Sequence, residues 1–226
     1  MIYVTGDTHI PIDLGKLNMK NFPVQKGLRE DDYLIICGDF GGVWDGGSEE
    51  KYWLKWLNSK NFTTLFVDGN HENFQALEEN YQIEQFCGGK IHRIQSNIIH
   101  LMRGQVYALE GRRFFTMGGA DSHDKEHRKE GKTWWAQEMP SQLEYQEAED
   151  NLSKQNWDVD FVITHCAPET IQQHIGDDYS ENDLTHFLEQ IKNKLSYEKW
   201  FFGHYHVDKQ VDFKHICLFN KILRIV

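Results

Sequence analysis

Short apolar runs alternate with segments of helical periodicity along the first half of the chain. The runs cover residues 2–4, 33–37 and 62–67, and a glycine follows each within two residues. Runs this short and bounded by glycine are typical of buried strands. Serine and two glutamates at 48–50 precede an apolar stripe and predict a capped helix, and apolar residues at helical spacing predict another helix after His71. This alternation predicts parallel strands joined by helical crossovers.

The second half of the chain predicts further strands and two amphipathic helices. Ser141 and Glu144 form a capping-box pattern before one helix, and Ser180 is expected to cap the other. Glu110-Gly111-Arg112 lies between two apolar runs and predicts a hairpin turn. The predicted strands fall within 91–101, 105–117, 159–163, 199–202, 209–213, 215–219 and 222–226.

No internal repeat, low-complexity tract or linker interrupts these elements. A chain of 226 residues can bury a substantial core without disulfides or a structural metal. We therefore predict a single domain over residues 1–226. Residues 120–140 are polar and include a pair of tryptophans, and we interpret them as a long ordered loop that faces the substrate.

The charge balance limits the possible partners. The chain has 24 Lys and Arg against 35 Asp and Glu, so its formal net charge is −11. Binding to a nucleic-acid backbone depends on basic residues that neutralise phosphates, so strong nucleic-acid affinity is not expected. Anionic membrane surfaces are disfavoured for the same reason. A short anionic substrate is compatible with this charge if a metal supplies positive charge.

The cysteines and the apolar runs indicate a cytoplasmic protein. The four cysteines are far apart and form no CxxC pair, which is typical of reduced thiols rather than of a zinc ribbon. No apolar run approaches the ~20 residues of a membrane span, and no basic segment precedes the first strand. We therefore expect neither an anchor nor a secretory signal. The sequence does not predict the oligomeric state.

Five of the predicted strands end in residue types that bind metals. In open α/β sheets, sites form beyond the carboxyl ends of the strands. The first three motifs are each about one strand–helix unit apart, so they are expected to return to the same sheet edge. The motifs are Asp7-x-His9, Gly38-Asp39, Gly69-Asn70-His71, His165 and Gly203-His204-x-His206.

These residue types predict a metal site. Asp, Asn and His supply oxygen and nitrogen donors that suit Mn, Fe, Zn or Ni. The candidates are too many for one ion, whereas two ions that share a carboxylate such as Asp39 would use all of them. The candidate ligands are Asp7, His9, Asp39, Asn70, His165, His204 and His206.

The five motifs, in this order and spanning Asp7 to His206, resemble the calcineurin-like metallophosphoesterase superfamily. The segment Gly42-Val43-Trp44-Asp45 is similar to small bacterial and phage-encoded members. The resemblance implies an α/β fold, a two-sheet β-sandwich flanked by helices in four layers (αββα), with the metal site at the C-terminal edge of the strands. It also implies a metal-dependent phosphoesterase, a hydrolase that acts on phosphoric ester bonds.

The resemblance further implies a division of the ligands and a mechanism. Asp7, His9, Asp39 and His206 would hold the first ion, and Asp39, Asn70, His165 and His204 would hold the second. A hydroxide bridging the two ions would attack phosphorus in line. His71 would lie near the leaving group and donate a proton to it. Asp39 and His71 are therefore the candidate catalytic residues.

The sequence leaves the substrate open. We expect a small phosphorylated molecule, a nucleotide or cyclic nucleotide, bound as a phosphate monoester or diester. No arginine closely follows Asp39, unlike in the Ser/Thr protein phosphatases of the superfamily, and this argues against that activity and against dinucleoside-tetraphosphate hydrolysis. A nuclease or polynucleotide phosphatase is the alternative enzyme, and a non-catalytic metal-binding scaffold is the alternative outside catalysis.

Substrate contacts are expected from the 120–140 loop and from Asn70. Lys125 and Arg128 are candidates to clamp a phosphate, with a solvated loop as the alternative interpretation. Trp134 is a candidate to stack on a nucleobase. For the pair Trp134-Trp135, packing of at least one ring over the core edge is the favoured interpretation.

Overall fold

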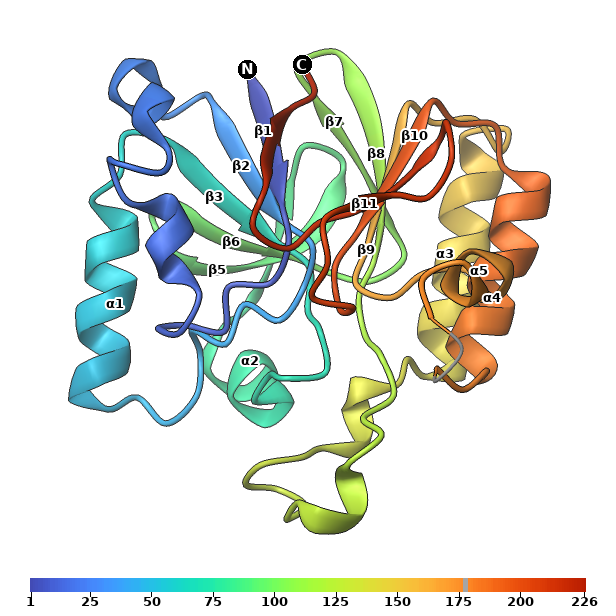
Figure 1. The fold of residues 1–226 in the computed structure, drawn as a ribbon, viewed down its shortest axis with the longest axis horizontal. Helices are drawn as coiled ribbons and strands as arrows, with labels where there is room; N and C mark the ends of the chain where they lie inside the picture. Colours follow the sequence, from blue (N-terminus) through green and yellow to red (C-terminus); the bar gives the residue numbers. More distant parts are fainter. Residues whose placement is uncertain (177–178) are drawn as a thin grey trace.

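The computed structural model describes residues 1–176 and 179–226 and confirms the α/β architecture. Two mixed β-sheets pack face to face, and helices cover the outer face of each, so the layers run α/β/β/α (Figure 1). The first sheet has the strand order β13-β1-β2-β3-β6-β5-β4, and the second has the order β11-β12-β10-β9-β8-β7. Within the described ranges, none of the helices combines the length and apolar character needed to cross a membrane.

The elements have the following bounds. The first sheet contains β1 (Ile2–Thr5), β2 (Tyr33–Ile36), β3 (Thr63–Phe66), β4 (Ile83–Phe86), β5 (Gly89–Gln95), β6 (Ile98–Leu101) and β13 (Ile222–Arg224). The second sheet contains β7 (Gln105–Leu109), β8 (Arg112–Met117), β9 (Phe161–Thr164), β10 (Lys199–Phe202), β11 (Lys209–Gln210) and β12 (His215–Cys217). The helices are α1 (Ser48–Asn58), α2 (Phe74–Asn80), α3 (Gln142–Lys154), α4 (Glu169–Gln173) and α5 (Asp183–Lys194). Short 3-10 turns lie at Leu14–Leu17, Pro23–Gly27, Lys125–His127 and Ala136–Glu138.

The central strands are buried on both faces. In β2, Ile35 belongs to the core between the two sheets, whereas Leu34 packs in the outer core with Leu54 of α1. In β9, Ile163 faces the core between the sheets and Val162 faces the helical layer of α3 and α5. Because successive side chains of a strand point to opposite faces, a strand between two cores needs apolar residues throughout. This explains why the apolar runs are continuous rather than alternating.

Parallel pairing brings the strand ends together. β1 pairs with β2 and β2 with β3 in parallel, and β9 pairs with β10 in parallel in the other sheet. The carboxyl ends of these strands lie at the end of the molecule from which the 120–140 loop protrudes (Figure 1). The site predicted at the carboxyl ends of the strands therefore receives strand ends from both sheets.

Several local predictions are confirmed. Leu109 pairs with Arg112 across a two-residue turn in which Glu110 and Gly111 have φ of 51° and 74°. Such positive φ values are typical of tight hairpin turns. The Ser141 and Glu144 capping box forms at the start of α3.

Other local predictions are corrected. Gly47 rather than Ser48 is the N-cap of α1. Asn182 rather than Ser180 caps α5, and its side chain accepts hydrogen bonds from the backbone of Leu184 and Thr185. The strand predicted at 209–213 ends at Gln210. The sequence pattern does not predict β4 or α4, because β4 is largely exposed and α4 has only five residues.

Candidate metal centre

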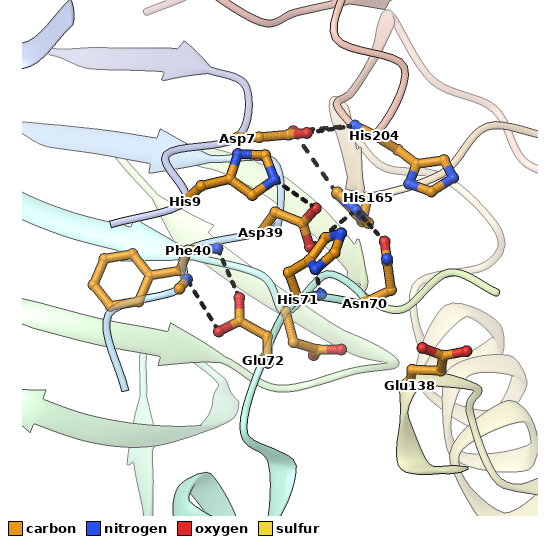
Figure 2. A network of polar contacts seen from close by, with 12 residues as sticks. Asp7, His9, Asp39, Phe40, Asn70, His71, Glu72, Glu138, His165 and His204 are labelled. Carbon is orange, nitrogen blue, oxygen red and sulfur yellow. Dashed lines mark hydrogen bonds and ion pairs between the residues drawn. The ribbon is translucent and has the colours of Figure 1, made fainter. Parts of the chain in front are cut away.

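The sequence-predicted ligands converge at the carboxyl ends of five strands from both sheets. Asp7 and His9 follow β1, Asp39 follows β2, and Asn70 follows β3. His165 directly follows β9, and His204 and His206 follow β10. Figure 2 shows Asp39 in the middle of this group, with His9 and His165 directed toward it and with Asp7, Asn70 and His204 nearby on other segments.

Asp7, His9, Asp39 and His206 form a first group. Each offers a ligand atom that lies within 4.8 Å of the ligand atoms of the other three. His9 Nε2 is 3.1 Å from Asp39 Oδ2, and His206 Nε2 is 3.3 Å from Asp7 Oδ2. Both carboxylates are buried, and the His206 side chain is half exposed. Two carboxylate oxygens and two imidazole nitrogens are a donor set that fits one divalent metal ion.

A second group lies on the other side of Asp39. His165 Nε2 is 3.3 Å from Asp39 Oδ1 and 3.2 Å from Asn70 Oδ1. The ring of His204 lies 4.9 Å from that of His165, measured between centroids. Thus Asp39 directs Oδ2 toward the first group and Oδ1 toward the second. One carboxylate between two sets of donors is the arrangement that a bridging ligand requires.

Hydrogen bonds orient two of the histidines. His165 Nδ1 donates to the carbonyl of Cys37 over 2.8 Å, which leaves Nε2, the nitrogen that a metal would bind, directed toward Asp39. His9 Nδ1 donates to Asp13 Oδ2 over 2.8 Å, again leaving Nε2 toward the centre. Partners of this kind fix the tautomer of a metal-ligating histidine. Asp13 supports His9 but belongs to none of the sequence motifs; its only sequence signal is its position four residues after His9.

The backbone around the ligands adopts an uncommon conformation. His9, Asp39, His204 and His206 all have positive φ, between 33° and 68°. Non-glycine residues rarely occupy this region, and they cluster at functional sites when the surroundings hold them there. Gly69 shows how closely the segments approach, because a Cβ at this position would overlap the carboxylate of Asp39. The glycine beside Asn70 therefore has a direct steric cause here.

Two buried ionisable residues support the loops that carry the ligands. Glu72 accepts hydrogen bonds from the backbone of Phe40 at 2.7 Å and Gly41 at 3.2 Å, and so holds the segment after Asp39 (Figure 2). Burial and the nearby charge of Asp39 raise the pKa of Glu72 to about 8. Lys16 donates to the carbonyls of Gly6, Asp7 and Phe219, and burial lowers its pKa to about 8.

The electrostatics favour added positive charge. Burial would lower the pKa of His9 and of His165, but hydrogen bonds and charge from Asp39 outweigh it and raise these values to about 9 and about 10. The same contacts outweigh burial at Asp39 and hold its pKa well below the usual range. Burial and the charge of His165 lower the pKa of His204 to about 3. In the metal-free protein, protons on His9 and His165 thus supply the positive charge that bound metal ions would supply.

Metal binding is therefore expected to release protons and to tighten as pH rises. At pH 7, below both raised pKa values, His9 and His165 are protonated in the metal-free protein. A metal must displace these protons, so its apparent affinity increases up to about pH 9 to 10 and then levels off. Calorimetric titration with Mn²⁺ in buffers of different ionisation enthalpy measures the protons released. An affinity that is independent of pH between 6 and 9 would contradict this prediction.

His71 and Arg128 face the centre without belonging to either ligand group. The backbone N–H of His71 donates to Asp39 Oδ1 over 2.8 Å, and its ring lies 5.5 Å from that of His9. The Arg128 guanidinium lies against the His71 ring, with Nη1 3.0 Å from Nδ1 and Nη2 3.4 Å from Nε2. Burial lowers the pKa of His71, and the positive charge of Arg128 adds to this, against the attraction of Asp39.

The other loop candidates lie in different surroundings. Lys125 Nζ forms an ion pair with Asp121 at 2.7 Å and is largely exposed. Trp134 is half-buried, and Trp135 is buried edge-on against the ring of Trp44, with centroids 5.4 Å apart. One ring of the tryptophan pair is expected to pack over the core edge, and the buried ring is that of Trp135. Of the loop candidates, Arg128 is the one that contacts His71.

A buried chain of hydrogen bonds fixes the amide of Asn70. Asn70 Nδ2 donates to Ser122 Oγ over 3.0 Å, and Ser122 Oγ donates to Glu138 Oε2 over 2.6 Å. Glu138 also accepts from the backbone N–H of Ser122. This leaves Asn70 Oδ1 directed toward His165. The sequence gives no signal for Ser122 and Glu138, because neither belongs to a motif.

Ser122→Ala is expected to weaken metal affinity by about 10- to 100-fold, the usual effect of removing a group that orients a ligand. The variant removes the acceptor of Asn70 Nδ2, so the amide is free to rotate. Titration with Mn²⁺ checks this, with Ser153→Ala on the exposed face of α3 as the matched control. Equal affinity in both variants would show that Asn70 needs no such support.

Comparison with known proteins agrees with this geometry. A model of the calcineurin-like phosphoesterase family matches residues 1–208 of the 226-residue chain. The search of curated proteins found no match. The match covers strands β1 to β10 of the two sheets and every candidate ligand. The chain therefore belongs to the calcineurin-like phosphoesterase family, whose members are metal-dependent hydrolases that act on phosphoric esters.

Proposed function

We propose that this protein hydrolyses a phosphate monoester or diester of a small substrate, a nucleotide or cyclic nucleotide, at a centre that holds two divalent ions. The observation that carries the proposal is Asp39, whose two carboxylate oxygens face two separate groups of donors. Asp7, His9 and His206 would hold one ion with Asp39. Asn70, His165 and His204 would hold the other with it.

Bound divalent ions supply positive charge for the phosphoryl oxygens and lower the pKa of a water that attacks phosphorus. The protein contributes geometry to this chemistry. Its ligands come from five strand ends and are held by Cys37, Asp13 and Ser122, so little reorganisation is needed when the substrate binds. Fixed donors of this kind stabilise charge as it develops in the transition state.

His71 is the residue placed to protonate the leaving oxygen. It lies beside Asp39 but outside both ligand groups, so its ring remains available to the substrate. Burial, together with the charge of Arg128, keeps the pKa of His71 low in the free protein. The negative charge of a bound phosphate attracts Arg128 and favours the protonated form of the His71 imidazole. Arg128 is thus proposed to contact a phosphate oxygen while His71 delivers the proton.

The charge of the chain supports a small substrate over a polynucleotide. The chain has 24 basic against 35 acidic residues, whereas a nuclease grips successive phosphates with Lys and Arg. Lys125, the second basic candidate of the loop, pairs with Asp121 instead.

A substrate panel tests the proposal. The Mn²⁺-loaded protein is assayed with bis(p-nitrophenyl) phosphate, p-nitrophenyl phosphate, cyclic nucleotides, nucleoside monophosphates and single-stranded DNA. We expect turnover of an ester of a small molecule and much slower cleavage of DNA. Preferred cleavage of DNA would favour the nuclease alternative, and metal binding without turnover of any ester would contradict the proposal.

A further inference from the structure

A groove of about 510 Å³ opens beside the candidate metal centre. His9 and His71 line its inner end, so it begins where the proposed reaction would take place. From there it runs along residues 10–12 and 41–42 to the first turns of α1, which lie at the same end of the molecule as the 120–140 loop (Figure 1). Its volume falls in the usual range of small-ligand sites, about 300–1,000 Å³.

Two tryptophans, Trp44 and Trp53, give the groove an aromatic lining. The ring of Trp44 is held edge-on by the buried Trp135, with centroids 5.4 Å apart. Its carbonyl accepts a hydrogen bond of 2.6 Å from the Asn73 side chain. Trp53 packs edge-on against Trp56 of the same helix, with centroids 5.9 Å apart. Both rings are therefore positioned before a ligand arrives.

The segment that carries Trp44 is tied to α1. The Glu50 carboxylate accepts hydrogen bonds from the backbone of Trp44, Asp45 and Gly46, at 2.8, 2.9 and 2.9 Å. Glu50 therefore fixes the position of the segment that forms one wall of the groove. A preformed wall lowers the ordering cost of binding.

The charges of the groove select what can enter it. Beyond the histidines at its inner end, its charged lining consists of the carboxylates of Asp45, Glu49 and Glu50, and among the described residues neither lysine nor arginine lines it. Like charges repel, so a second phosphate is disfavoured there. A flat, uncharged group that bears hydrogen-bond donors fits tryptophan faces and carboxylates together.

We propose that this groove binds the nucleobase of the substrate against Trp44 and Trp53. This inference rests on the proposed function, and it adds where the nucleoside lies. With the phosphate at the metal centre, the nucleoside oxygen faces His71 and the base extends toward α1. Base stacking on aromatic side chains is sequence-tolerant, so the groove accepts purines and pyrimidines and discriminates against esters that lack a base.

Equilibrium binding of adenosine to the Mn²⁺-loaded protein tests the inference without requiring turnover. Trp44→Ala and Trp53→Ala are expected to raise the Kd for adenosine by about 5- to 150-fold, the range that corresponds to ~1–3 kcal/mol per stacked base. Trp157→Ala, a half-buried tryptophan that packs against the core of the other sheet and lies outside the groove lining, is the matched control and should leave the Kd unchanged. Trp53→Phe keeps an aromatic face and should bind within a few-fold of the unmodified protein, which guards against an alanine variant that misfolds.

The outcomes separate this inference from the proposed function. Adenosine binding that depends on the two tryptophans, with no hydrolysis of any ester, would support the groove and contradict the proposed function. Equal kcat/KM for adenosine 5′-monophosphate and ribose 5-phosphate, with no adenosine binding, would leave the esterase intact and overturn the groove. Binding of choline in place of adenosine would also overturn it, because the groove would then select a cation rather than a base.

Discussion

Asp39→Asn is expected to reduce kcat for phosphoester hydrolysis by at least about 10³-fold. Both oxygens of Asp39 are in use, with Oδ2 facing His9 and Oδ1 facing His165. An amide has one oxygen and no charge, so it cannot serve two ions, and its NH₂ group would point at a ligand nitrogen or at a metal. Steady-state assays with saturating Mn²⁺ measure the loss, and metal analysis of the same sample shows whether an ion is lost with it.

Asp212→Asn is the matched control for this substitution. Asp212 also contacts a histidine, His215 at 2.8 Å, but it belongs to the turn between β11 and β12 rather than to the centre. Activity within tenfold of the unmodified protein in Asp39→Asn, with the variant folded by circular dichroism, would remove Asp39 from its bridging role.

His71→Ala is expected to lower kcat by about 10²–10⁴-fold for an alkyl phosphate ester, the usual contribution of a general acid. The loss should be much smaller for p-nitrophenyl phosphate, because p-nitrophenolate leaves without needing a proton. Metal content should not change, since His71 lies outside the two ligand groups. Comparing the two substrates in the same variant therefore separates proton donation from metal binding.

His174→Ala, an exposed histidine whose Nδ1 bonds to the carbonyl of Thr170, provides the control for removing an imidazole. An equal loss on both substrates in His71→Ala would contradict proton donation by His71. It would instead assign the residue to binding or to the support of Asp39.

The central part of the site is predictable from the sequence because it depends on topology. Short buried strands are recognisable in the sequence as apolar runs, and residues such as Asp7 and Asp39 closely follow them. Once β1, β2 and β3 pair in parallel, their carboxyl ends must share one edge. Pairing of β9 with β10 brings His165 and His204 to the same place. The convergence therefore follows from the order of the elements, without knowledge of any contact.

The supporting residues are not predictable in this way. Ser122 and Glu138 come from an irregular loop whose path has no periodicity, so their contact with Asn70 exists only in three dimensions. Asp13 lies in the segment between β1 and the first 3-10 turn. The exact start of a helix also depends on local backbone conformation. Ser48 and Ser180 are residue types that often cap helices, but Gly47 and Asn182 have the extended backbone that a cap requires. The groove beside the centre also combines segments distant in sequence, with Trp135 supporting Trp44 from another loop.

Anomalous diffraction from crystals of the protein soaked in Mn²⁺ tests the account most directly. Two peaks are expected on opposite sides of the Asp39 carboxylate, ~3.5–4 Å apart, as in two-metal sites. One should be bounded by Asp7, His9 and His206, and the other by Asn70, His165 and His204. A single peak that leaves one oxygen of Asp39 without a metal, or no peak at this sheet edge, would contradict a dinuclear phosphoesterase centre.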